Sequence, residues 1–195
     1  MVKQIRTALV AFILLTLITG AFYPLLMTGV GQVLFPFQAN GSLIVKNGNV
    51  VGSSIIGQTT DSMAYFWWRP SAVNAMQGSS PESLIASGAT NYGWTNAAQA
   101  EQVAERETAI RTANGLSNDT PIPADLLFAS ASGLDPHISP EAAALQINRV
   151  AEARNLDRTQ VEALVTQYTE SPQFGIFGEP RVNVLLLNLA LDGLE

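Results

Sequence analysis

The residues with the clearest chemical potential surround His137, the only histidine in the chain. It lies in Asp135-Pro-His-Ile-Ser139, shortly after Ser130 and Ser132, so a Ser/His/Asp arrangement for hydrolysis is one hypothesis. Triad members normally meet through the fold, and the chain has no Gly-x-Ser-x-Gly motif. With no cysteine and no second histidine, zinc is not expected. We therefore predict no catalytic and no metal-binding residues, and interpret the segment as a rigid junction between a loop and a helix.

A second hypothesis concerns an anion site at Ser130, Ser132 and Gly133. A turn of this kind can cradle an anion with its backbone N–H groups, but the pattern is common and of low specificity. The chain has neither a Walker motif nor a dinucleotide fingerprint, and Lys46 is the only lysine after the N-terminal segment. We name these three residues as cofactor-binding candidates and expect no directly bound cofactor.

Aromatic residues and one arginine cluster in Tyr65-Phe-Trp-Trp-Arg-Pro-Ser71. Trp, Tyr and Arg dominate the energetic hot spots of protein interfaces, which favours a docking surface. The competing interpretation is a local core in which the arginine stacks on a ring. The residues that we name as candidates for partner contact in this segment and in the histidine junction are Tyr65, Trp67, Trp68, Arg69, Asp135 and His137.

These residues follow an N-terminal stretch without charge between Arg6 and Lys46. It opens with an apolar run of about 20 residues, the length that crosses a hydrocarbon core as a helix. Basic flanks stay on the cytoplasmic side, so Lys3 and Arg6 predict that the rest of the chain lies outside, in the periplasm. The boundaries we predict are a cytoplasmic N-terminus at 1–6, a transmembrane helix at 7–28 and a juxtamembrane connector at 29–39.

Small residues near the end of this run suggest helix packing. Gly29 and Gly31 would let another span approach closely, so both are candidates for partner contact. A cleaved signal peptide, with its site after Ala21, is the competing interpretation of the N-terminus. The apolar character continues to Phe37, beyond any such site, and this favours an uncleaved single-pass anchor in the inner membrane.

Residues 40–195 have the length of one extracytoplasmic domain. All sixteen acidic residues but only eight of the ten basic ones follow Arg6, so this domain is acidic. The balance argues against nucleic acid as a partner and against a basic surface for anionic lipid. Because the chain has no cysteine, its fold receives no disulfide.

The local patterns predict an α+β fold, in which one transmembrane helix precedes a mixed domain with a β-hairpin and several helices. Asn47-Gly48 is typical of a hairpin turn between strands at 42–46 and 49–56. Gly52 indicates either a bulge or a close approach of another backbone segment. Capping residues predict helices at 97–113, 140–154 and 158–168. Residues 182–192 fit either a strand or a short helix capped by Asn183.

In combination, these segments resemble the C subunit of the bacterial Kdp potassium-transporting ATPase over nearly the whole chain. Asp135-Pro-His-Ile-Ser-Pro140 is the most specific of the shared motifs. Trp67-Trp68 departs from the His-Gly that is usual in the family. The other segments that carry the resemblance are Gly52-Ser-Ser-Ile-Ile-Gly-Gln58, Arg69-Pro-Ser-Ala72, Pro121-Ile-Pro-Ala-Asp-Leu126 and Gly178-Glu-Pro-Arg-Val-Asn-Val184.

The resemblance implies a non-catalytic accessory subunit of a high-affinity, ATP-driven potassium uptake complex. Its partners would be a channel-like potassium-translocating subunit, a P-type ATPase catalytic subunit and a small single-span peptide. It would stabilise their assembly and raise the ATP affinity of the catalytic subunit as a "catalytic chaperone", while the complex handles ATP and potassium. The alternative function is a membrane-anchored periplasmic hydrolase that uses His137 and a nearby serine.

Overall fold

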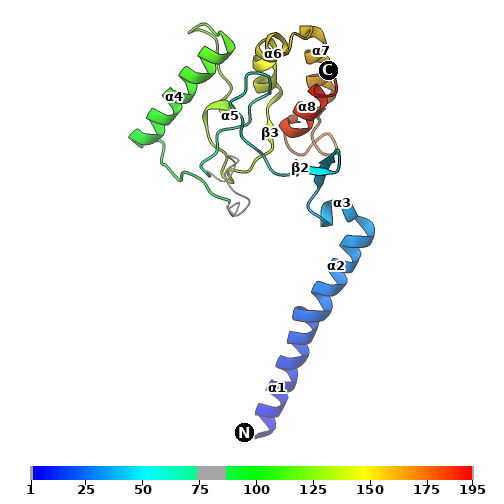
Figure 1. Cartoon of the computed structure of the whole chain (residues 1–195). Helices are drawn as coiled ribbons and strands as arrows, with labels where there is room; N and C mark the ends of the chain where they lie inside the picture. The colour runs from blue at the N-terminus through cyan, green and yellow to red at the C-terminus, as the bar shows by residue number, and fades with distance from the viewer. Residues whose placement is uncertain (1, 74–86, 195) are drawn as a thin grey trace. The chain divides into compact units, whose positions relative to one another are not determined.

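The computed structural model describes residues 2–73 and 87–194 (Figure 1). The chain forms two compact units, Met1–Ser53 and Ser54–Glu195. One N-terminal helix is followed by a β-hairpin and then by a mixture of helices and short strands. This arrangement confirms the predicted α+β class.

The N-terminal helix is continuous through α1 (Val2–Leu17), the π-helical turn η1 (Ile18–Phe22) and α2 (Tyr23–Leu34). Its stretch Lys3–Leu34 is long and apolar enough to cross a membrane, judged by length and composition, and none of its apolar window is buried. The helix extends past both ends of the predicted span at 7–28. The first part of the predicted connector is therefore helical.

The π-helical turn has a local cause in Pro24. A proline inside a helix lacks the N–H, and its ring collides with the carbonyl four residues earlier. The helix widens here, and the Tyr23 N–H donates to the Ile18 carbonyl oxygen, five residues back. The Thr19 hydroxyl donates to the Leu15 carbonyl oxygen at 2.7 Å, so this polar side chain is also satisfied within the helix.

A β-hairpin follows the short helix α3 (Pro36–Ala39) and consists of β1 (Leu43–Lys46) and β2 (Asn49–Ser53). Asn47 and Gly48 both have positive φ, at 53° and 79°, as a type I′ turn requires. Gly52 pairs with Ile44, next to a shift of register, which confirms the predicted bulge. The second strand ends at Ser53 and does not reach the predicted residue 56. Beyond it the chain leaves the hairpin, and the N–H of Gly57 donates to the carbonyl oxygen of Leu134.

The second unit combines one small sheet with helices of different lengths. The sheet is antiparallel, with the order β3-β5-β4. Its strands are β3 (His137–Ile138), β4 (Thr169–Glu170) and β5 (Arg181–Asn183), and the helices are α4 (Ala97–Asn114), α5 (Ala124–Leu127), α6 (Pro140–Arg154), α7 (Arg158–Gln167) and α8 (Val184–Leu191).

Side-chain caps begin the longer helices where the sequence predicts. Asn96, Ser139 and Asp157 each accept a hydrogen bond from a backbone N–H in the first turn of α4, α6 and α7. Asn183 does the same for α8 while it is also the last residue of β5. The ambiguous segment 182–192 is therefore a strand that passes directly into a helix.

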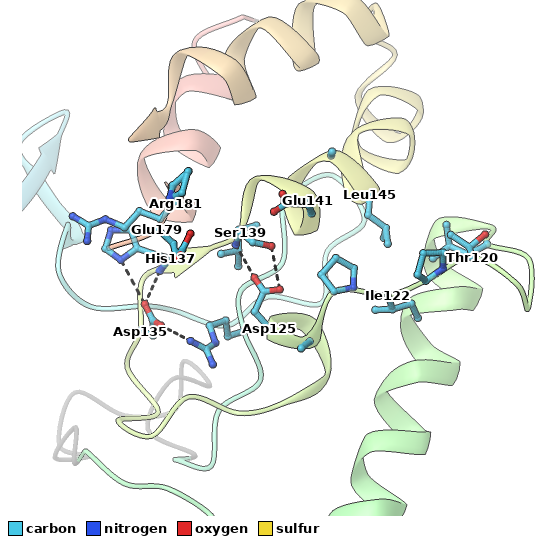
Figure 2. A pocket seen from close by; sticks show the side chains of 18 of the residues that line it. Thr120, Ile122, Asp125, Asp135, His137, Ser139, Glu141, Leu145, Glu179 and Arg181 are labelled. Carbon is cyan, nitrogen blue, oxygen red and sulfur yellow. Dashed lines mark hydrogen bonds and ion pairs between the residues drawn. The ribbon is translucent and has the colours of Figure 1, made fainter. Parts of the chain in front are cut away.

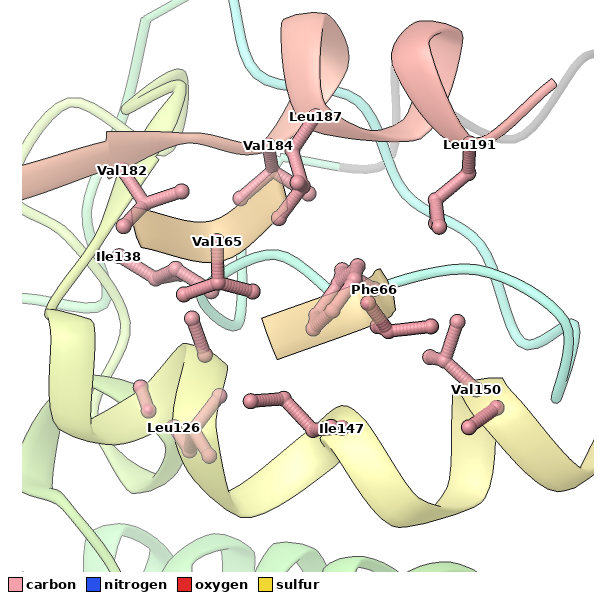
Figure 3. Packing of buried hydrophobic residues seen from close by; sticks show 14 of the residues in the cluster. Phe66, Leu126, Ile138, Ile147, Val150, Val165, Val182, Val184, Leu187 and Leu191 are labelled. Carbon is pink, nitrogen blue, oxygen red and sulfur yellow. The ribbon is translucent and has the colours of Figure 1, made fainter. Parts of the chain in front are cut away.

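The core of the second unit lies among α6, α7, α8 and the sheet (Figure 3). The helices supply one apolar face each, and Figure 3 shows Phe66 reaching into this space from an irregular segment far from them in sequence. Phe66 is completely buried. Its equally buried neighbours in this core include Val150, Val161, Leu187 and Leu191.

One charged side chain is built into this interior. Arg149 of α6 is 5% exposed, and its guanidinium lies 4.5 Å from the centre of the Trp67 ring. Burial lowers its pKa to about 10, so it stays charged at neutral pH. It donates to the backbone carbonyls of Ser62, Met63 and Tyr65 and to the side-chain oxygens of Asn114 and Gln146.

We expect Arg149→Met to lower the free energy of unfolding by about 3 kcal/mol, because the carbonyl and amide oxygens would stay buried without a donor. Denaturant unfolding of the full chain in detergent, followed by circular dichroism, measures this loss. Arg158→Met, at an exposed position of α7, should change the value by less than about 0.5 kcal/mol. Equal losses in the two variants would contradict the structural role of Arg149.

Candidate functional site

A wide groove of about 1110 Å³ crosses the second unit and contains the histidine junction. One wall is the proline-rich segment that leads into α5, and the other is formed by β3 and the first turns of α6 (Figure 2). Glu179 and Arg181 close one end. The groove thus brings Arg69, the proline-rich segment, the histidine junction and Arg181 together on one face.

Asp135 is the electrostatic centre of this groove. Arg69 donates to its Oδ2 at 2.7 Å, and the backbone N–H of His137 donates to its Oδ1 at 3.0 Å (Figure 2). The ring Nδ1 of His137 lies 3.5 Å from the same Oδ1. Partial burial alone raises the pKa of Asp135, but the bonds from His137 and Arg69 outweigh it and lower the pKa to about 2. Three predicted site residues therefore form one ion-paired cluster.

The side chain of Ser139 caps α6 and binds Asp125 of α5. Its hydroxyl donates to Asp125 Oδ1 at 3.1 Å and accepts from the Ala142 N–H at 3.0 Å, and its own N–H donates to Asp125 Oδ2 at 2.6 Å. These bonds fasten α5 to the start of α6. A hydroxyl that accepts the capping bond and donates to a carboxylate is not poised toward His137 as a nucleophile.

The predicted anion turn is likewise occupied by its own serines. Ser130 Oγ accepts from the Gly133 N–H at 2.9 Å, and Ser132 Oγ accepts from the Leu134 N–H at 3.1 Å. Ser71 Oγ donates to the Gly133 carbonyl oxygen at 2.7 Å. Two N–H groups of the turn, those of Gly133 and Leu134, therefore already have acceptors. Together with Ser139, this geometry does not support the hydrolase alternative.

Gly133 is required by space as well as by conformation. Its φ is +69°, and a Cβ built there would lie 2.7 Å from the Gly88 carbonyl oxygen. The glycine thus lets the Ser130 turn pack directly against another loop. This role explains its place in the shared motif without any ligand.

The aromatic segment is packed into the domain, as the interpretation of a local core has it. The arginines over its rings are Arg149 and Arg154, however, and its own Arg69 pairs with Asp135. The side chain of Asn188 bonds both the N–H and the carbonyl of Phe66, at 2.8 and 3.0 Å. The side chain of Gln146 does the same for Trp67, at 2.7 and 3.3 Å. Tyr65 stacks on Arg154 at 4.5 Å. Partner contact through Tyr65, Trp67, Trp68 or Arg69 stays a prediction for whatever surface they leave accessible.

The two glycines of the N-terminal helix lie on different faces. Residues two apart on an α-helix are separated by about 200° around its axis. A Cβ at Gly31 would lie 4.0 Å from Ala39 of the following short helix, whereas one at Gly29 meets nothing within 4 Å. Of the two predicted contacts, Gly29 is therefore the position open to another span.

Sequence reasoning missed the polar residues that hold the aromatic segment in place. Gln146 and Arg149 lie on the same face of α6 as its apolar residues, and Asn188 interrupts a leucine-rich run in α8. All three are buried, at 1%, 5% and 5% exposure. A polar residue at a core position was the available signal, because such a residue needs a partner inside the fold.

Comparison with known proteins identifies the family. The model of the KdpC family, described as the K+-transporting ATPase c chain, matches residues 5–193. A potassium-transporting ATPase KdpC subunit of Dechloromonas aromatica is 53% identical over 191 residues, which cover 98% of this chain and 97% of that protein. A KdpC subunit of Methylococcus capsulatus is also 53% identical, over the full length of both chains. That of Sorangium cellulosum is 50% identical over 99% of each.

The fold is that of an α+β protein with one N-terminal helix that is a candidate membrane span, and its groove holds a cluster built around the Arg69–Asp135 ion pair. The chain belongs to the KdpC family, the c chain of the K+-transporting ATPases. The resemblance noted in the sequence is thereby confirmed.

We expect Asp135→Asn to cost about 1–2 kcal/mol of stability at pH 7, because the folded state holds the pKa of this carboxyl below its unfolded value of 3.8. A lowered pKa stabilises the fold above the unfolded value, and the contribution is lost as pH falls toward 2. The gap between variant and wild type should therefore narrow between pH 5 and pH 2, measured by denaturant unfolding.

Asp119→Asn is the matched control, since this aspartate lies on the surface outside the groove. Its unfolding curve should follow that of the wild type across the same range. A gap for Asp135→Asn that does not change with pH would show that the charge of Asp135 is unimportant for stability.

Proposed function

We propose that the chain is a non-catalytic accessory subunit of an ATP-driven potassium uptake complex. The observation that carries the proposal is similarity over the whole length to proteins named as KdpC subunits of a potassium-transporting ATPase. In this role it assembles and stabilises a channel-like potassium-translocating subunit, a P-type ATPase subunit and a small single-span peptide. ATP and potassium are handled by the complex.

The exposed apolar helix and the bonded polar side chains of the groove support a function through contact with a partner. The N-terminal helix exposes a continuous apolar surface, as a lipid-facing or partner-facing span must. In the groove, Asp125, Asp135 and Ser139 hold neighbouring elements together. Such a domain offers a rigid shape to a partner.

The charge distribution supports a single-pass topology with the N-terminus inside. Lys3 and Arg6 precede the apolar helix, and Lys46 is the first charged residue after Arg6. By the positive-inside rule, the second unit then lies on the extracytoplasmic side of the inner membrane. Any effect on the ATP affinity of the catalytic subunit therefore passes through the complex, because ATP is cytoplasmic.

We expect Gly29→Leu to reduce co-purification of the channel-like subunit, because the added side chain would hold a neighbouring helix away from the only backbone surface that is open at this glycine pair. Met27→Leu, about 200° away around the helix, is the matched control and should keep full yield. Pull-down from membranes that contain all subunits measures both. Full yield with Gly29→Leu would exclude packing at this face.

The ATP effect requires a separate experiment. Omission of this chain from the assembled complex should raise the KM for ATP of the catalytic subunit, whereas the full chain alone should show no ATP binding in calorimetry. Micromolar binding by the chain alone, abolished by Ser132→Ala, would contradict coupling through the complex and restore the anion-turn hypothesis.

A further inference from the structure

The loop between β4 and β5 carries an exposed apolar tip. Phe174, Ile176 and Phe177, named here the aromatic tip, are 92%, 79% and 65% exposed. Residues 171–178 carry no charge, and Glu179, two positions before β5, is the only charged residue between β4 and β5. Large apolar side chains gathered at one protruding point mark a site of interaction with a partner or a membrane.

The tip is preformed by bonds within its own backbone. Gln173 and Phe177 exchange hydrogen bonds, N–H to carbonyl, at 2.8 and 2.9 Å, and the N–H of Ile176 also donates to Gln173 at 3.1 Å. Gly175 has a φ of 73° and donates to Pro172 at 3.0 Å. Backbone groups that are already paired can enter an apolar medium at low cost.

Charge appears at the neck of the loop, at Glu179 and at an ion pair between the two strands. Arg181 Nε lies 2.9 Å from Glu170 Oε2, where β5 and β4 pair. Apolar side chains at the tip and an ion pair at the base reproduce the polarity profile of a bilayer surface, from acyl chains to headgroups.

The size of the tip also favours lipid over protein. With aromatic side chains burying 150–250 Å² each, the three residues offer roughly 400 Å². A stable protein interface buries about 800 Å² on each partner, so the tip alone is too small for one. A bilayer that held the apolar helix would, by contrast, stay within reach of the tip, because only residues 35–53 connect the end of that helix to the second unit.

We propose that the aromatic tip inserts into the surface layer of the same bilayer that holds the N-terminal helix, and gives the domain a second point of attachment. The loop has no basic residue, so the contact is with the neutral acyl–headgroup boundary and needs no anionic lipid. The proposal rests on the membrane placement of the N-terminal helix and is independent of the proposed role in potassium uptake.

Depth measurement by spin labelling tests the proposal, and the absence of cysteine allows single labels without background. The full chain with Gln173→Cys, reconstituted in phosphatidylcholine vesicles, should place its label about 5–10 Å below the headgroups. Collisions with oxygen should then exceed those with a water-soluble nickel chelate. A label at Glu101→Cys, on the exposed face of α4, should be accessible to the chelate.

Removal of the tip side chains supplies the decisive comparison. Adding Phe174→Ser and Phe177→Ser to Gln173→Cys should return the label to water, while the Glu101→Cys label keeps its spectrum and reports an intact fold. A Gln173→Cys label as accessible to the chelate as that at Glu101→Cys would overturn the proposal. So would a label that becomes shielded from both reagents only when the other subunits are present, since the occupant would then be a protein.

Discussion

The second unit depends on the burial of Arg149, a cation surrounded by backbone carbonyls, amide oxygens and an aromatic ring. None of these partners is a carboxylate, so the charge is satisfied by dipoles alone. Apart from the Gln146 amide, which belongs to α6 itself, these dipoles come from segments that are far from α6 in the sequence. One guanidinium therefore ties both the start of the irregular segment, at 62–65, and the last turn of α4 to α6.

Two buried side-chain amides also bind the backbone of a distant segment. Gln146 and Asn188 each bond the N–H and the carbonyl of one residue in the aromatic segment, as a neighbouring strand would. Phe66 can then enter the core without leaving its backbone groups unpaired. The irregular segment thus behaves as a strand whose partners are side chains. This explains how a domain with so small a sheet maintains a packed interior.

In the groove, the Asp135–Ser139 motif serves to hold the fold together. Asp135 joins Arg69 to the histidine junction, and Ser139 joins α5 to α6. The residue types are those of a hydrolase, yet the donors and acceptors are directed at neighbouring backbone and at one another. Rigid connection of these elements suits a subunit that works by presenting a surface.

Local physics made much of this structure predictable. The apolar run, the Asn47-Gly48 turn and the caps at Asn96, Ser139 and Asp157 act over a few residues, and each element formed where its signal lay. The segment at 182–192 was ambiguous because Asn183 serves both as the end of a strand and as a helix cap. Even the resemblance to the family rested on such contiguous motifs.

Contacts between distant residues were decided only by the tertiary structure. Gln146 is separated from Trp67, and Asn188 from Phe66, by most of the domain, and no short-range pattern encodes which carbonyl a buried amide will meet. The same holds for the aromatic segment, whose composition suits an interface or a core equally well. The sequence by itself determined the long apolar helix, the local elements and the family. Only the fold decided which side chains are buried and which, like Phe174, point outward, because burial depends on the whole set of neighbours.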